Sequence, residues 1–117
     1  RRAWPARGMV ADTALHMLGW NEEKIKAFLL RSGRINNPDK MLERMATAPA
    51  QLTAYDSGFL EILLLREMAK KGLGQSFNLK EFHHLILKNG NVPMGALKTQ
   101  VVDWVNRQSD DKNENSK

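Results

Sequence analysis

Two groups of polar residues have the types and the spacing that chemistry requires. Asp12 and His16 are four positions apart, so on a helix both side chains project from one side. A carboxylate placed there can orient an imidazole for proton transfer or for contact with a transition state. The same spacing also produces a helix-stabilising Asp–His pair, and spacing alone favours that structural interpretation.

The second group lies on a predicted long helix, where Tyr55, Ile62 and Arg66 share one face. Tyr55 is the only tyrosine. Its phenol could donate a hydrogen bond to a developing oxyanion, and the guanidinium of Arg66 could bind a substrate carboxylate through two hydrogen bonds. The alternative is a buried tyrosine with one hydrogen bond and an arginine whose charge reaches solvent, which periodicity alone favours.

The remaining histidines and the tryptophans are interpreted as structural. His83 and His84 are consecutive, so on a helix their side chains point about 100° apart and do not readily share a metal. We expect His83 on the apolar side of its helix and His84 in a more exposed position. Trp4, Trp20 and Trp104 each lie near a predicted helix end, where tryptophan commonly fills a core, and no basic stripe accompanies them.

Composition excludes several classes of site. The 117 residues contain no Cys, which removes disulfides, thiol nucleophiles and Cys-bound metals. No HExxH, Gly-rich phosphate loop or GxSxG motif is present, so we expect no metal or cofactor to be bound by this chain. The net charge of +5 permits binding to anions, but the basic residues are dispersed and do not favour nucleic acid as a partner.

The hydrophobic spacing predicts an all-α fold of about six helices, packed as an irregular bundle. The predicted helices cover residues 6–18, 22–31, 39–45, 50–71, 79–88 and 93–107. Asn21 and Asn78 are predicted N-caps, and Gly72 with Gly74 is predicted to end the long fourth helix. We therefore expect one helical region over residues 1–108 and a disordered polar tail over residues 109–117.

Two stretches resemble a known family. Residues 8–20, GMVADTALHMLGW, resemble a block of the form (R)LVVDTGLHxxGW. Residues 43–105 resemble E-R-Y-x₃-PGQAxxYxxG, then a helix with LR, then LGxxFxLxxFHxxxLxxGxxPLxxLxxxVxxW. Both blocks are similar to family 885 of the bacterial domains of unknown function, which looks like zinc metallopeptidases of the HExxH type. This chain departs from the blocks at Met45 (Tyr in the family), Ala50 (Gly) and His84 (commonly Asp).

The resemblance implies that the chain is the C-terminal part of a longer protein whose zinc-binding helix lies before Arg1. Zinc would then belong to the parent protein, and this chain alone would not hydrolyse peptides. By analogy with helical gluzincins, Tyr55 and His16 would face the oxyanion, with Asp12 orienting His16. Arg66 and Arg44 would anchor a substrate carboxylate or pair with an acid of the core.

The same resemblance implies partners and a location. We expect the chain to pack on the missing N-terminal zinc-bearing portion, to contact a peptide substrate, and to self-associate when isolated. A secreted, periplasmic or lipid-anchored protein is expected from the family, although the first residues carry no apolar signal core. The alternative is a small basic all-α interaction module without catalytic activity, which binds an acidic partner and no metal.

Overall fold

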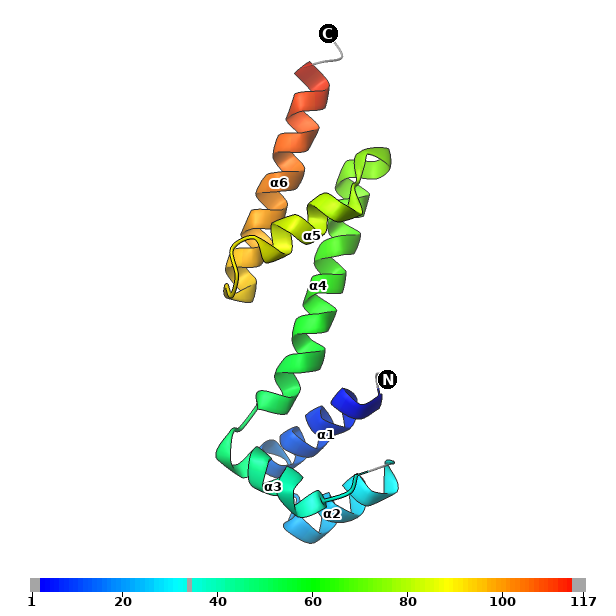
Figure 1. Ribbon diagram of the computed structural model, residues 1–117, viewed down its shortest axis with the longest axis vertical. Helices are drawn as coiled ribbons and strands as arrows, with labels where there is room; N and C mark the ends of the chain where they lie inside the picture. The colour runs from blue at the N-terminus through cyan, green and yellow to red at the C-terminus, as the bar shows by residue number, and fades with distance from the viewer. Residues whose placement is uncertain (1–2, 34, 115–117) are drawn as a thin grey trace. The chain divides into compact units, whose positions relative to one another are not determined.

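The structure is all-α, as predicted. The computed structural model describes the backbone of residues 3–33 and 35–114 and the side chains of residues 5–33 and 35–111, and it contains no strand within those ranges (Figure 1). The elements are α1 (Ala3–Met17), α2 (Glu22–Arg31), α3 (Pro38–Thr47), α4 (Gln51–Leu73), a short 3₁₀ helix η1 (Gly74–Ser76), α5 (Leu79–Leu87) and α6 (Met94–Glu114).

Asparagine side chains begin three of these helices. The Oδ1 of Asn21 accepts a hydrogen bond from the backbone N–H of Lys24 at 3.0 Å, and Asn78 Oδ1 accepts from Lys80 N–H at 2.9 Å. Asn37, which the sequence did not single out, caps α3 in the same way. Each side chain satisfies at least one of the backbone donors that the first turn of a helix leaves without a partner, and Asn78 Oδ1 also accepts from Glu81 N–H.

Several helix ends differ from the prediction, including the start of α1 at Ala3 rather than residue 6 and the end of α3 at Thr47 rather than residue 45. α4 continues through Gly72 to Leu73, and the left-handed residue that follows is Gly74, with φ of 55°. α6 continues beyond Arg107 to Glu114, so residues 109–114 of the expected tail are helical and residues 115–117 lie outside the described part of the chain. The helix could not be predicted in this segment, because the segment is polar and has no apolar residues from which a helical period could be read.

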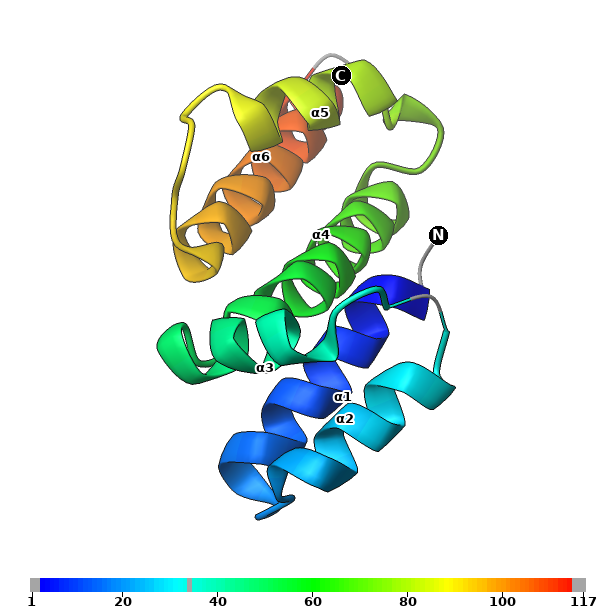
Figure 2. The ribbon, with the colours of Figure 1, turned by 60° about the horizontal axis from the view of Figure 1, so that its bottom comes forward.

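The chain divides into two compact units, Arg1–Phe59 and Leu60–Lys117, and the division falls within α4. In the first unit, α2 packs against both α1 and α3 (Figure 2). Trp20 packs on the core of this unit and meets Phe28 edge to face, with ring centroids 5.9 Å apart. The fully buried core residues of the first unit are Ala11, Ala14, Ile25, Leu29, Met45 and Leu52.

The second unit has an aromatic core in which α5 packs across α6 (Figures 1 and 2). Phe82 is buried, and its ring centroid lies 6.5 Å from that of Trp104. A Cβ added to Gly72 would lie 2.6 Å from Val105 Cγ1, so the glycine allows α4 and α6 to approach closely. Phe82 is surrounded by the buried residues Leu65, Ala69, Leu85, Leu97 and Val101.

The second unit corrects one expectation. His83 is exposed rather than on the apolar side of its helix, and His84 is exposed as well. The buried stripe of α5 consists of Phe82 and Leu85, three positions apart, and His83 is rotated about 100° away from Phe82. Trp104 packs against the core, as the structural interpretation expected, whereas the side chain of Trp4 lies outside the described residues.

Candidate functional site

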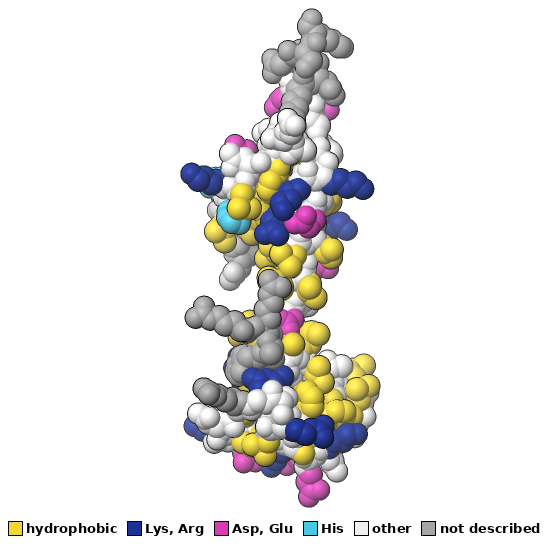
Figure 3. Space-filling model, turned by 90° about the vertical axis from the view of Figure 1, so that its right-hand side faces the viewer, with side chains coloured by type: hydrophobic (Ala, Val, Ile, Leu, Met, Phe, Trp, Pro, Cys, Tyr) yellow, Lys and Arg dark blue, Asp and Glu magenta, His cyan; other side chains and the backbone are white. Residues whose placement is uncertain are grey.

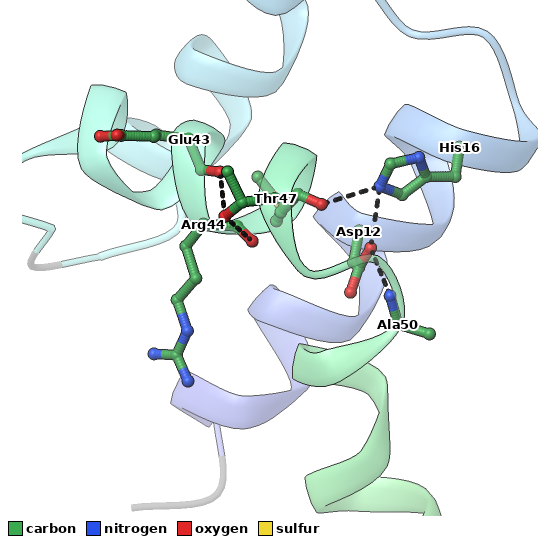
Figure 4. A network of polar contacts seen from close by, with 7 residues as sticks. Asp12, His16, Glu43, Arg44, Thr47 and Ala50 are labelled. Atoms are coloured by element: carbon green, nitrogen blue, oxygen red, sulfur yellow. Dashed lines mark hydrogen bonds and ion pairs between the residues drawn. The ribbon is translucent and has the colours of Figure 1, made fainter.

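Asp12 is the charged residue that the first unit buries. Its side chain is 2% exposed. Asp12 Oδ1 accepts a hydrogen bond from the backbone N–H of Ala50 at 3.2 Å and lies 3.4 Å from His16 Nε2 (Figure 4). Because α4 begins directly after Ala50, the carboxylate lies at the positive end of the dipole of that helix. Asp12 Oδ2 is buried and accepts no hydrogen bond from the described residues.

His16 is held through one ring nitrogen. Nε2 lies 3.1 Å from the carbonyl oxygen of Met45 and 3.4 Å from Asp12 Oδ1. Both oxygens can only accept, so Nε2 must carry the hydrogen that they share. In the neutral imidazole the lone pair therefore lies on Nδ1, and the side chain as a whole is 33% exposed. Figure 4 shows Nδ1 on the side of the ring away from these contacts.

The backbone next to this pair is strained. Ala50 has φ of 64°, the left-handed region that alanine disfavours and glycine adopts freely. The family block that this stretch resembles has Gly at this position, as a positive φ favours. Ala at position 50 therefore lowers the stability of the turn. The hydrogen bond from the N–H of Ala50 to Asp12 holds the strained turn in place.

A pocket of about 340 Å³ opens beside the Asp12–His16 pair, entirely within the first unit. Its lining is mostly apolar and includes two threonines. The lining includes Asp12, Thr13, His16, Pro49, Ala50 and Thr53. A pocket of this size, with a few convergent polar groups, is typical of a small-ligand or substrate subsite.

A second polar group joins the end of α3 to the start of α4. Arg44 Nε donates to Gln51 Oε1 at 2.7 Å, and Arg44 Nη2 donates to the Tyr55 hydroxyl oxygen at 3.3 Å. Tyr55 is 54% exposed, so it is not the buried tyrosine of the structural alternative. Since its oxygen accepts from Arg44, the phenol hydrogen can be donated to a further group. Figure 4 shows Arg44 extending away from the Asp12–His16 pair.

Arg66 belongs to the second unit and pairs with its neighbour. Arg66 Nη2 lies 3.2 Å from Glu67 Oε1, and Lys70 Nζ lies 3.1 Å from the same oxygen. The hydrogen bond from Lys70, with a further contribution from Arg66, lowers the pKa of Glu67. Two cations therefore share one carboxylate on the exposed side of α4, and the guanidinium of Arg66 already has an anionic partner.

The structure thus brings the predicted residues together in two pairs, Asp12 with His16 and Arg44 with Tyr55. Sequence reasoning missed Gln51 as a partner of Arg44, and it missed two backbone groups, the Met45 carbonyl and the Ala50 N–H. Gln51 matches a family block and could have been found there, whereas no sequence signal marks a backbone partner. Among the described side chains, those of residues 5–33 and 35–111, no group of three or more His, Cys, Asp or Glu is arranged to hold a metal ion.

Comparison with known proteins agrees with this fold. Residues 1–101 match the family model described as "Bacterial protein of unknown function (DUF885)", and the chain belongs to this family. A solved structure described as "the putative lipoprotein from Colwellia psychrerythraea" is 37% identical in sequence and superposes with a TM-score of 0.81. The match covers 88% of this chain and 18% of that one, so this chain spans a small part of the similar protein. No curated protein matches the chain.

Proposed function

We propose that this chain is the C-terminal helical part of a zinc-dependent peptidase-like protein, in which the first unit contributes substrate and transition-state contacts. The observation that carries the proposal is the buried Asp12 carboxylate, which lies beside one nitrogen of His16, and both residues line a pocket. A buried charge is costly, and such charges are common where a side chain must be oriented for chemistry.

In this proposal His16 and Asp12 act as a pair. With Nε2–H directed at Asp12 and the Met45 carbonyl, Nδ1 of a neutral ring can accept a hydrogen bond from a substrate group or a proton from solvent. Once protonated, the ring becomes a donor to a developing oxyanion, and the carboxylate of Asp12 stabilises the imidazolium. Asp12 is thus a positioning residue that acts through His16.

Tyr55 is the second proposed contact. Its hydroxyl accepts from Arg44 and keeps its own hydrogen for an oxyanion, so the guanidinium both orients the phenol and favours its donation. Arg44 also offers positive charge to a substrate carboxylate. Arg66 is proposed as a further binding residue for a substrate carboxylate. The substrate carboxylate must compete with that of Glu67 for the Arg66 guanidinium.

Zinc would be held by residues outside this chain, because the described residues offer no ligand set for it. Bound there, it would supply a water activated for attack on an amide. The similar solved protein is several times longer than the part that this chain matches, which supports a further portion in one polypeptide.

Exposed apolar side chains support packing against that portion and self-association of the isolated chain. On α4, Leu60 is 53% exposed and Leu64 is 65% exposed. Figure 3 shows hydrophobic side chains reaching the surface between basic ones. The described helices include none long and apolar enough to cross a bilayer. With the lipoprotein described above as a neighbour, we propose a secreted, periplasmic or lipid-anchored protein.

The test is zinc analysis and peptide hydrolysis by the full-length protein that carries these residues. We expect about one zinc per polypeptide, and a loss of turnover on the order of 10²-fold or more for both His16→Ala and Tyr55→Phe at unchanged zinc content. The matched control is His83→Ala, an exposed histidine in the second unit, which should retain full turnover. Absence of zinc, or full activity in both His16→Ala and Tyr55→Phe, would contradict the proposal.

A further inference from the structure

A second depression lies in the second unit, between α5 and α6, and it goes beyond the proposed function without resting on it. Its volume is about 430 Å³. Lys80, His84 and Lys88 follow one another along one side of α5 at intervals of four positions, and all three are exposed. Trp104 of α6 and the buried Leu85 form the apolar part of the same depression. We call Lys80, His84, Lys88 and Trp104 the basic groove.

The basic groove carries a net positive charge, because its two lysines face one carboxylate, that of Glu81. Among the described residues, no ion pair is recorded for Lys80 or Lys88, whereas Lys26 and Lys70 each have a carboxylate partner. Glu81 is the acidic residue of the lining. His84 lies one helical turn from each lysine and adds positive charge when protonated.

The apolar part of the basic groove is rigid. The Trp104 ring meets Phe77 edge to face at 6.5 Å and lies at the same distance from Phe82. Phe82 is itself buried, so the indole is held by core aromatics on one side and lines the groove on another. A fixed indole beside lysines is suited to an apolar side chain that is flanked by negative charges.

The spacing of the lysines indicates the length of the ligand. From Lys80 to Lys88 the helix rises about 12 Å, at 1.5 Å per residue. An extended peptide rises about 3.3 Å per residue, so two carboxylates four positions apart span a similar length. The residue halfway between them would then lie over Trp104.

We propose that the basic groove binds an extended acidic peptide segment with two carboxylates four positions apart and an apolar residue between them. A polyanion such as nucleic acid fits less well, because two lysines make a basic stripe too short for a chain of phosphates. The same argument disfavours an anionic membrane surface.

The probe is the fluorescein-labelled peptide Gly-Glu-Ala-Phe-Ala-Glu-Gly, titrated with the full chain in a fluorescence anisotropy measurement. We expect saturable binding that weakens as salt rises and is lost when both glutamates of the peptide are replaced by glutamine. The double variant Lys80→Glu/Lys88→Glu should weaken binding by roughly tenfold or more. His84→Asp, which places a carboxylate one helical turn from each lysine, should weaken it by a smaller factor.

The matched control is Lys40→Glu/Lys98→Glu, which changes the net charge equally at exposed lysines outside the groove. It should keep the affinity of the unchanged chain. All four lysines are exposed, so circular dichroism should show the same helix content for both double variants. The proposal is overturned if the peptide does not bind saturably, or if the control weakens binding as much as the groove variant. It is equally overturned if duplex DNA or anionic vesicles bind the basic groove more tightly than the peptide.

Discussion

The two units use polar residues in opposite ways. The first unit buries a carboxylate beside an imidazole and bends its backbone into a left-handed conformation at Ala50. The second unit buries only hydrophobic side chains among its described residues and keeps its charges on the surface, where Lys80 and Lys88 border an aromatic core. Both are small helical assemblies, so helix packing does not require the buried charge of the first unit.

The difference separates residues that maintain the fold from residues that add chemistry. In the second unit, stability comes from Phe82 and its neighbours, and the exposed lysines could change with little cost to the fold. In the first unit the polar pair lies against the core, so a change at Asp12 should affect both the stability and the proposed chemistry. Three substitutions test this contrast.

The largest expected effect is in the second unit. Phe82→Ala removes a ring that is 1% exposed and should cost about 3–5 kcal/mol of unfolding free energy. If the units are stabilised separately, hydrogen exchange should quicken across residues 60–111 while α1 and α2 stay protected. Leu87→Ala, on the same helix but 72% exposed, serves as the control and should change little. Equal loss of protection in both units would show that they unfold as one.

An intermediate effect is expected from Asp12→Ala. The substitution leaves the N–H of Ala50 and the Nε2–H of His16 without their carboxylate acceptor. It should lower the unfolding free energy, measured by urea denaturation, by about 1–3 kcal/mol. The neighbouring Thr13→Ala, an exposed position, should stay within about 0.5 kcal/mol. Unchanged stability in Asp12→Ala would mean that the carboxylate is not needed for the fold, and would leave orientation of His16 as its role.

The smallest effect has the opposite sign. Ala50→Gly relieves a φ of 64° and should raise the unfolding free energy by about 0.5–1 kcal/mol. The same substitution inside α4, Ala54→Gly, should lower it by a similar amount because glycine disfavours a helix interior. Thermal melting of the two variants, side by side, measures the contrast. A destabilised Ala50→Gly would show that the turn prefers the alanine.

Local features allowed most of the fold to be predicted. Asn21 and Asn78 mark helix starts because their side chains act within three residues, and the apolar period is visible over each helix except the end of α6. There, Ser109 Oγ donates a hydrogen bond to the Val105 carbonyl oxygen at 2.9 Å. The helix continues beyond this point without apolar residues that would show a helical period.

The site was harder to predict because its contacts join distant residues. Asp12 and His16 share a helix face, so their proximity followed from spacing, but the Met45 carbonyl that holds His16 is 29 positions away. Arg44 and Tyr55 lie on either side of a break at Pro49, where helical periodicity cannot be carried across. In the basic groove the spacing of the lysines is visible in the sequence, but the position of Trp104 depends on how α6 packs on α5.

The backbone acceptor of the His16 hydrogen bond affects which substitutions position 45 can tolerate. Because Nε2 of His16 donates to the backbone carbonyl of Met45, the contact does not depend on which side chain occupies position 45. Met in place of the Tyr of the resembling block therefore leaves the hydrogen bond to His16 unchanged, provided that the backbone of α3 is unchanged. A hydrogen bond made to the main chain is inherited with the fold, and mutation of its acceptor residue leaves it in place.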